Sequence, residues 1–156
     1  MAGPTKRGRD DAAHRIADEC IAVRVRMINR VVTGAFDEAL RPFGITVAQI
    51  NVLVSVQSLG EPLQSEIGSI LYLEKSTLSR NVERLVRDGY LRARDVADSR
   101  SRRLSVSARG RQLIERALPA WESAQERVRE ILGDDTERAL RDTADSLWRA
   151  AGLVDD

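Results

Sequence analysis

Cysteine, histidine and aromatic residues are scarce in this chain of 156 residues, and their scarcity excludes several kinds of site. With Cys20 as its one cysteine and His14 as its one histidine, the chain cannot form an intramolecular disulfide or a cysteine zinc cluster. The sequence also contains no nucleophile elbow, phosphate-binding loop or metal-ligand spacing. We therefore predict no catalytic residues, no metal and no cofactor, and a protein that is not an enzyme.

Long hydrophobic runs are also missing. No stretch approaches the roughly 18 apolar residues of a membrane-spanning helix, and the opening MAGPTKRGRDD lacks the apolar segment of a signal peptide. Aromatic residues make up 4% of the chain, so a core must rest on Leu, Val, Ile and Ala. We expect a soluble, globular protein of the cytoplasm that has no membrane partner.

The charges of the chain are unevenly distributed. The formal net charge is only +1, yet residues 75–111 hold eleven basic and four acidic residues, which gives +7 there and leaves −6 elsewhere. A basic block in an otherwise acidic chain is typical of a surface that binds a polyanion.

The segment 74–89, EKSTLSRNVERLVRDG, lies at the start of this basic block. Leu78, Val82 and Leu85 recur at helical spacing, and Gly89 is placed to end the helix. The remaining side chains are hydroxyl, amide and basic groups, which suit base edges and phosphates. A basic helix face can also be merely solvent-exposed, but we predict a DNA recognition helix. Its predicted contact residues are Lys75, Ser76, Thr77, Ser79, Arg80, Asn81 and Arg84.

The segments before and after this helix favour the DNA-binding interpretation. Helices are predicted over 47–59 and 63–71, and a tight turn joins the second of them to the recognition helix, as in a helix-turn-helix. Beyond Gly89, apolar and basic residues alternate on both sides of a polar loop, which predicts a β-hairpin. Such a wing can place an arginine in the minor groove. We predict DNA contacts for Arg100 and Arg102.

Three long helices flank the DNA-reading segment, over 11–41, 108–132 and 136–151. Their apolar stripes exceed what one small core can absorb, so we expect them to pack on a second copy rather than into an intramolecular bundle. A two-fold axis would then set two recognition helices on a pseudo-palindrome, with half-sites about 34 Å apart. The predicted dimerisation residues are Ile16, Cys20, Val23, Leu140, Leu147 and Trp148.

The predicted fold is therefore mainly α with a small β-hairpin wing. Residues 1–10 are expected to be a flexible tail, and residues 11–156 a single domain of six helices with the wing between the fourth and the fifth. Within that domain, 46–107 is the winged-helix DNA-binding lobe, while 11–41 and 108–152 form the helical dimerisation lobe.

The hairpin carries a motif that resembles the signature of MarR-type regulators (multiple antibiotic resistance regulators). Residues 98–110 read DSRSRRLSVSARG, and the family signature is D-x-R-x-x-x-L-x-L-T-x-x-G. The resemblance covers about residues 15–150. The chain departs from the family pattern at Val106, which replaces a leucine, at Ser107, which replaces a threonine, and at Glu74, which replaces a frequent aspartate.

The resemblance implies a winged helix-turn-helix homodimer that binds operator DNA, usually as a repressor. Small phenolic or other lipophilic molecules, or oxidants, typically release such regulators. Arg100 would lie at the wing tip, and Asp98 would hold the wing in shape. By the same carry-over, the residues that face the major groove are Ser76, Thr77, Ser79, Arg80 and Arg84.

Two alternatives and the effector site stay open at this point. Cys20 could make the chain redox-responsive, although its spacing from Ile16 and Val23 favours a packing role. The chain could also be a winged-helix module that binds another protein and has lost DNA binding, but the retained arginines argue against that. The effector-binding residues are unknown, and these residues could line a pocket or belong to the core: Met27, Phe36, Phe43 and Trp121.

Overall fold

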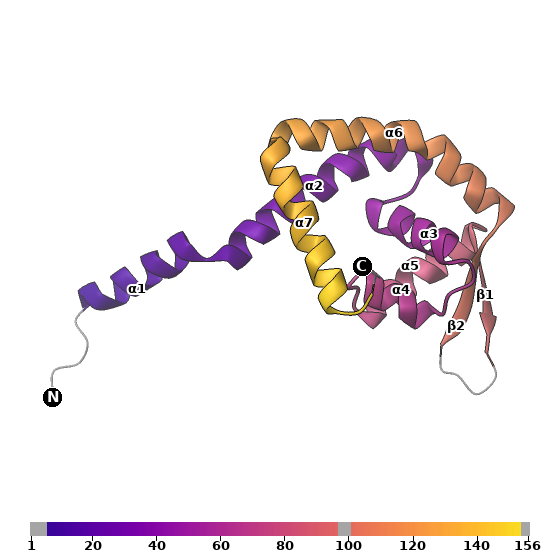
Figure 1. Cartoon of the computed structure of the whole chain (residues 1–156), viewed down its shortest axis with the longest axis horizontal. Coiled ribbons are helices and arrows are strands. Elements are labelled where there is room, and N and C mark those ends of the chain that lie inside the picture. Colours follow the sequence, from indigo (N-terminus) through magenta and orange to yellow (C-terminus); the bar gives the residue numbers. More distant parts are fainter. Residues whose placement is uncertain (1–5, 97–100, 154–156) are drawn as a thin grey trace. The chain divides into compact units, whose positions relative to one another are not determined.

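The structure is a computed structural model that describes residues 6–96 and 101–153, and it is mainly helical with one two-stranded sheet (Figure 1). The predicted fold class, helices with a β-hairpin wing, is confirmed. The elements are α1 (Lys6–Glu19), α2 (Ile21–Leu40), the 3-10 helix η1 (Arg41–Phe43), α3 (Val47–Leu59), α4 (Gln64–Ile70), α5 (Lys75–Arg87), β1 (Leu91–Asp95), β2 (Arg102–Val106), α6 (Ala108–Leu132) and α7 (Asp134–Ala150).

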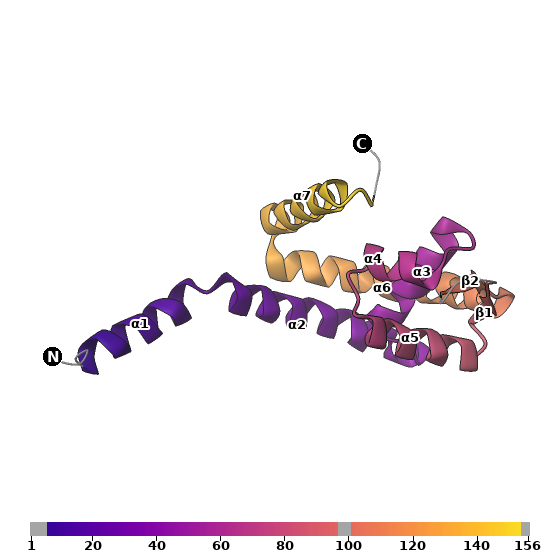
Figure 2. The ribbon, with the colours of Figure 1, turned by 90° about the horizontal axis from the view of Figure 1, so that it is seen from below.

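The chain forms two compact units, Met1–Gly34 and Ala35–Asp156, and the boundary falls within α2. In the first unit, α1 and α2 are separate helices with a break at Cys20 (Figure 2). The prediction of one continuous helix over 11–41 is therefore wrong. The Arg24 guanidinium donates to the carbonyl oxygens of Cys20, at 3.0 Å, and of Asp18. It thereby satisfies a carbonyl that the end of α1 leaves without a helical partner.

The first helix also begins earlier than expected. α1 starts at Lys6, inside the segment 1–10 that was predicted to be a flexible tail. Proline, the strongest helix breaker, is absent from residues 5–41, so no residue in this stretch prevents the helix from extending toward the N-terminus. The predicted end near Arg41 is confirmed, since η1 and Gly44, with a φ of +68°, terminate the helical run.

The core of the second unit surrounds α3, which contacts α4, α5, α6 and β2. Because neighbours enclose α3 on more than one side, its buried residues do not form a single stripe. Val52 is fully buried, whereas Val54 is 43% exposed. The buried hydrophobic residues that form this core are Leu40, Ile45, Ile50, Val52, Leu53, Val56, Ile67, Leu78, Val82, Leu85, Leu91, Leu104, Leu113 and Ala117.

The N-terminus of α3 is fixed by side chains that accept its free N–H groups. The Thr46 hydroxyl accepts from the Gln49 N–H at 3.3 Å, and the Gln49 side chain accepts from the Thr46 N–H at 3.1 Å. The Asp37 carboxylate accepts from the Val47 N–H at 2.7 Å. These bonds satisfy the donors that begin every helix, and α3 starts at the predicted residue.

No single helix among the described residues is long and apolar enough to cross a membrane. The bent pair Ile21–Phe43 and Val47–Leu59 meets that test jointly, by length and composition only. The second helix of this pair contributes Val52, Leu53 and Val56 to the core described above.

Ser107 connects the end of α5, the hairpin and α6 through hydrogen bonds. Its hydroxyl donates to the Gly89 carbonyl at 2.7 Å and accepts from the Gly110 N–H at 3.0 Å, and its own N–H donates to the Tyr90 carbonyl at 3.0 Å. A Cβ at Gly110 would lie 2.3 Å from the Tyr90 carbonyl oxygen, so α6 can approach the hairpin only with a glycine there. The serine and the glycine of the 98–110 motif thus have structural roles.

We expect Ser107→Ala to lower the free energy of unfolding by about 1–2 kcal/mol, because it removes a helix cap and leaves the Gly89 carbonyl without its donor. Urea unfolding measures this change. Ser107→Thr, which keeps the hydroxyl, and Ser105→Ala in β2 should remain close to wild type. An unchanged unfolding midpoint for Ser107→Ala would contradict the role of Ser107 in holding α5, the hairpin and α6 together.

Candidate nucleic-acid interface

The α5 helix buries one face and leaves the other open. Leu78, Val82 and Leu85 are each at most 3% exposed and pack into the core, as the sequence pattern predicted. In Figure 2, α5 lies at the edge of the second unit. Of the seven predicted contact residues on this helix, Lys75, Ser76, Arg80 and Arg84 are exposed, while Thr77, Ser79 and Asn81 are half-buried.

Arg80, Arg84 and Arg87 of α5 form interactions at the exposed surface of the helix. The Arg80 guanidinium donates to the Thr77 hydroxyl at 3.3 Å. Near the end of the helix, the Asp88 carboxylate pairs with both Arg84, at 3.2 Å, and Arg87, at 3.7 Å. Exposed ion pairs contribute about 0–1 kcal/mol. A phosphate could therefore replace Asp88 as the partner of either guanidinium at little cost.

The wing presents an apolar face to the core and a basic face away from it. The strands pair antiparallel with Ala93 opposite Leu104 and Arg94 opposite Arg103. Leu104 is fully buried, whereas Arg92 and Arg94 are exposed. The predicted alternation of apolar and basic residues along the hairpin is therefore present in the structure.

Of the two arginines predicted to contact DNA from the wing, the structure describes Arg102 and not Arg100. Arg102 is half-buried in β2 and donates to the Gln64 side-chain oxygen at 3.2 Å, so part of its guanidinium is already used. Arg100, predicted at the wing tip, and Asp98, predicted to shape the wing, both lie outside the described residues.

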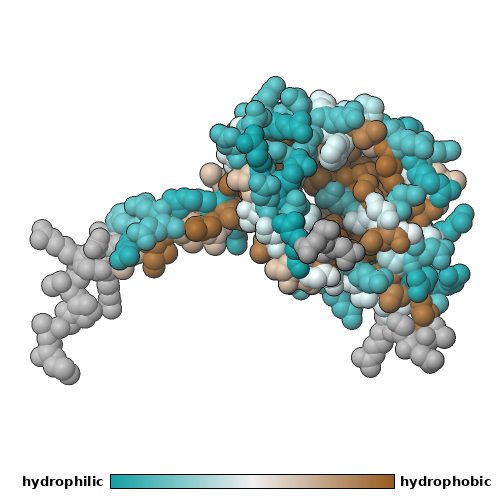
Figure 3. Space-filling model, in the orientation of Figure 1, coloured by the Kyte–Doolittle hydropathy of each residue, from teal (hydrophilic) through white to brown (hydrophobic). Residues whose placement is uncertain are grey.

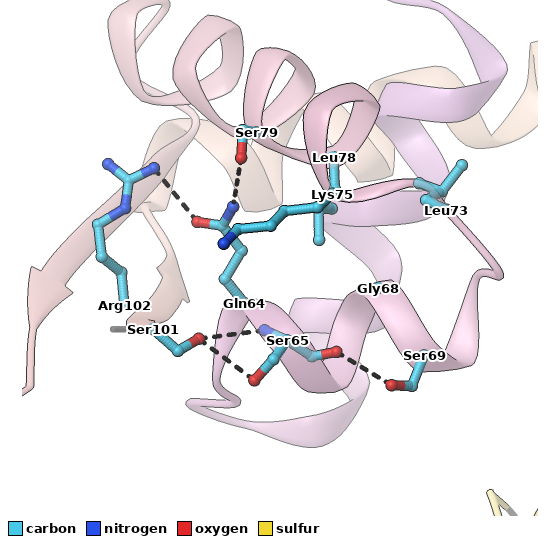
Figure 4. Close-up of a pocket in the computed structure, with 10 residues that line it drawn as sticks. All are labelled: Gln64, Ser65, Gly68, Ser69, Leu73, Lys75, Leu78, Ser79, Ser101 and Arg102. Carbon is cyan, nitrogen blue, oxygen red and sulfur yellow. Dashed lines mark hydrogen bonds between the residues drawn. The ribbon is translucent and has the colours of Figure 1, made fainter. Parts of the chain in front are cut away.

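An open groove of about 640 Å³ lies between α4, α5 and the start of β2 (Figure 4). Gln64 and Ser65 reach into it from α4 and form hydrogen bonds with residues of α5 and of the wing. Neither residue was predicted from the sequence, and their place at the start of the helix that precedes α5 is the one local signal that points to them. The groove is lined by Gln64, Ser65, Gly68, Ser69, Leu73, Lys75, Leu78, Ser79, Ser101 and Arg102.

The predicted dimerisation residues on α7 are partly exposed. Leu140 is 43% and Leu147 60% exposed. Trp148 is half-buried, and its indole N–H donates to the Ile70 carbonyl at 3.1 Å, so its polar atom is used within the chain.

On the same helix, a hydrogen bond from Arg141 lowers the pKa of the Glu137 carboxyl below its ordinary value.

The predicted dimerisation residues of the first unit are Ile16, Cys20 and Val23. Ile16 and Val23 are well exposed, while Cys20 is half-buried and lies at the break between α1 and α2.

Within the described part of the chain, no cluster of three or more His, Cys, Asp or Glu residues is placed to hold a metal.

The aromatic residues considered for an effector pocket are placed as follows. Phe36 is buried, and its ring lies 6.1 Å from that of Trp121, at an interplanar angle of 35°. Phe43 packs against the core, whereas Met27 in the first unit is exposed. For Phe36 and Phe43, the contacts favour the core interpretation over that of a pocket lining.

The sequence and the fold are both similar to known regulators. A family model described as the MarR family matches residues 43–101. The chain is 35% identical to the M. tuberculosis transcriptional regulator MosR, solved in complex with DNA, over 86% of this chain and 97% of that one, with a TM-score of 0.72. A mutant MarR from E. coli complexed with operator DNA has the same fold, at 19% identity over 85% of this chain and 96% of that one and a TM-score of 0.72.

A curated relative is the uncharacterised HTH-type transcriptional regulator YwoH of Bacillus subtilis, 33% identical over 73 residues. This match covers 47% of the chain and 53% of YwoH, so the chain spans about half the length of that relative.

We expect Asp88→Asn to strengthen binding to a polyanion, because it frees Arg84 and Arg87 from their carboxylate and removes a negative charge from the end of α5. The variant should elute from a heparin column at higher salt than wild type. Asp142→Asn on α7 makes the same change in net charge and should elute earlier than Asp88→Asn. Coincident elution of the two variants would show that the basic face of α5 has no special affinity for polyanions.

Proposed function

The chain belongs to the MarR family of transcription regulators, and we propose that it is a homodimer that binds a specific DNA operator. In this proposal it represses transcription in the cytoplasm by occupying a pseudo-palindromic sequence, and a small lipophilic or phenolic effector releases it. The observation that carries the proposal is the open polar and basic face of α5 beside a basic wing.

The chemistry of this face favours duplex DNA over other polyanions. An α-helix fits the major groove, which is about 12 Å wide. Hydroxyl and amide groups on Ser76, Thr77 and Asn81 can donate to and accept from base edges, while Arg80 and Arg84 can bind guanines or phosphates. A surface that bound any polyanion would need the charge but not the mixture of hydrogen-bonding groups. The DNA complex of MosR, the relative with 35% identity, further supports this choice.

Exposed apolar side chains support the homodimer. The chain leaves Leu140 and Leu147 exposed on α7, and Ile21, Val25 and Met27 exposed on α2. Figure 3 shows hydrophobic side chains gathered beside α6 as well. Large exposed apolar side chains of this kind, gathered on a surface, mark an interaction site, and a second copy offers the same faces in return. A two-fold axis would then present two recognition helices to two half-sites.

The proposed effector would meet an aromatic surface on α6. Trp121, 37% exposed beside the buried Phe36, offers an aromatic surface on which a phenolic ring could stack. We assign no residue to effector binding. Release of bound operator by phenolic compounds in a mobility-shift assay tests this part of the proposal separately.

We expect Arg84→Ala to weaken binding to a duplex that the wild-type chain selects by about 1–3 kcal/mol, because it removes a guanidinium from the exposed face of α5. Fluorescence anisotropy at fixed salt measures the change, and fixed salt matters because phosphate contacts depend strongly on ionic strength. Arg116→Ala on α6 removes the same charge from another helix and should bind as wild type does. Equal affinities for both variants would place the DNA surface elsewhere.

A further inference from the structure

The Gln64 side chain connects the recognition helix to the wing. Its amide nitrogen donates to the Ser79 hydroxyl on α5 at 3.2 Å, and its amide oxygen accepts from the Arg102 guanidinium on β2 at 3.2 Å (Figure 4). The orientation of the amide follows from the chemistry of its neighbours. A guanidinium can only donate, so the group facing Arg102 must be the oxygen, and the NH₂ group is left for Ser79.

A second set of contacts holds the wing to the same stretch of chain. The Ser65 N–H donates to the Ser101 hydroxyl at 3.2 Å, and that hydroxyl lies 3.2 Å from the Ser65 hydroxyl. The Leu104 N–H donates to the Pro62 carbonyl at 2.9 Å. Residues 62–65 therefore support β2 along its edge, which matters because an isolated two-stranded hairpin is only marginally stable.

These contacts hold different parts of β2. The backbone bond from Leu104 fixes the middle of β2. Gln64 holds Arg102, the first residue of the strand, and relates it to α5. Gln64 is half-buried, and both of its partners, Ser79 and Arg102, are among the residues predicted to contact DNA. A change at Gln64 would therefore alter the spacing between the helix and the wing without removing a group that contacts DNA.

We propose that Gln64 is a positioning residue whose amide holds β2 against the recognition helix and thereby fixes where the wing meets the DNA beside the major-groove site. This inference rests on the proposed function. The width of the minor groove depends on sequence, and a wing in that groove is sensitive to its width. By fixing the position of the wing, Gln64 therefore determines which flanking sequences are preferred. The helix alone would still recognise the centre of the half-site.

The test compares affinities for two duplexes that share a selected central sequence and differ in having A·T-rich or G·C-rich flanks. Wild type should prefer one of the two flanks. Gln64→Leu keeps the side-chain bulk and loses both hydrogen bonds, and we expect it to reduce the ratio of the two affinities about fivefold. Gln64→Glu should restore the ratio, because a carboxylate accepts from both Ser79 and Arg102. Its repulsion from phosphates lowers both affinities alike and cancels in the ratio.

Three controls make the outcome decisive. Gln112→Leu, on the exposed surface of α6, should leave both affinities unchanged. In the Gln64→Leu background, Arg102→Ala should reduce the ratio less than it does alone, as expected for residues that act together. If Gln64→Leu does not unfold cooperatively, Gln64→Ala replaces it.

Each outcome has a defined meaning. A wild-type ratio in Gln64→Leu overturns the inference, as does an equal loss for both duplexes, because that would mean a role in stability alone. A wild-type chain that shows no flank preference overturns it too, while leaving the proposed function intact. If wild type selects no duplex at all, it is the proposed function that fails.

Discussion

Leu78, Val82 and Leu85 of α5 are packed into the core of the second unit, and the rest of the proposed DNA-binding surface depends on their burial. Burying each of these side chains contributes about 1.5–3 kcal/mol. A rotation of α5 about its axis would expose them and bury arginines, at a prohibitive cost in free energy. The apolar stripe therefore directs the polar and basic face of α5 outward. Core packing does not fix which residues stand on that face, so they can be those that suit DNA recognition.

The wing depends on a different constraint. Its strands are short, and its outer face sets Arg94 opposite Arg103, a like-charged pair that destabilises a hairpin. Three contacts stabilise the hairpin. Leu104 is buried in the core, the Ser107 hydroxyl donates to the Gly89 carbonyl at the end of the hairpin, and Gln64 forms hydrogen bonds that connect β2 to α5. Glu61 partly offsets the repulsion through an exposed ion pair with Arg94 at 3.6 Å. A basic surface is thus maintained against an electrostatic cost, as expected where a polyanion binds.

Local sequence signals predicted much of this architecture. The apolar period of α5 and the alternation along the hairpin each reflect a physical requirement confined to a few neighbouring residues, and the structure confirms the elements they predicted. The same holds for the wing motif, whose Ser107 has a partner within three residues. The prediction of a transcription regulator that is not an enzyme is confirmed by the relatives.

The features that sequence reasoning missed depend on contacts between residues distant along the chain. Gln64 is 38 positions from Arg102, and Trp148 is 78 positions from the carbonyl it meets at Ile70, so neither contact leaves a periodic signal. The break at Cys20 was missed because the flanking sequence has strong helical character and the compensating group, Arg24, lies beyond the break.

The most direct measurement is the selection of bound duplexes from a random library at physiological salt with excess nonspecific competitor. We expect enrichment of an inverted repeat whose half-sites lie about one helical turn, roughly 34 Å, apart, because two recognition helices related by a two-fold axis require it. Such a repeat would establish specificity and dimeric binding in one experiment. The absence of any enriched sequence, with a protein that unfolds cooperatively, would contradict the assignment of α5 as a DNA recognition helix.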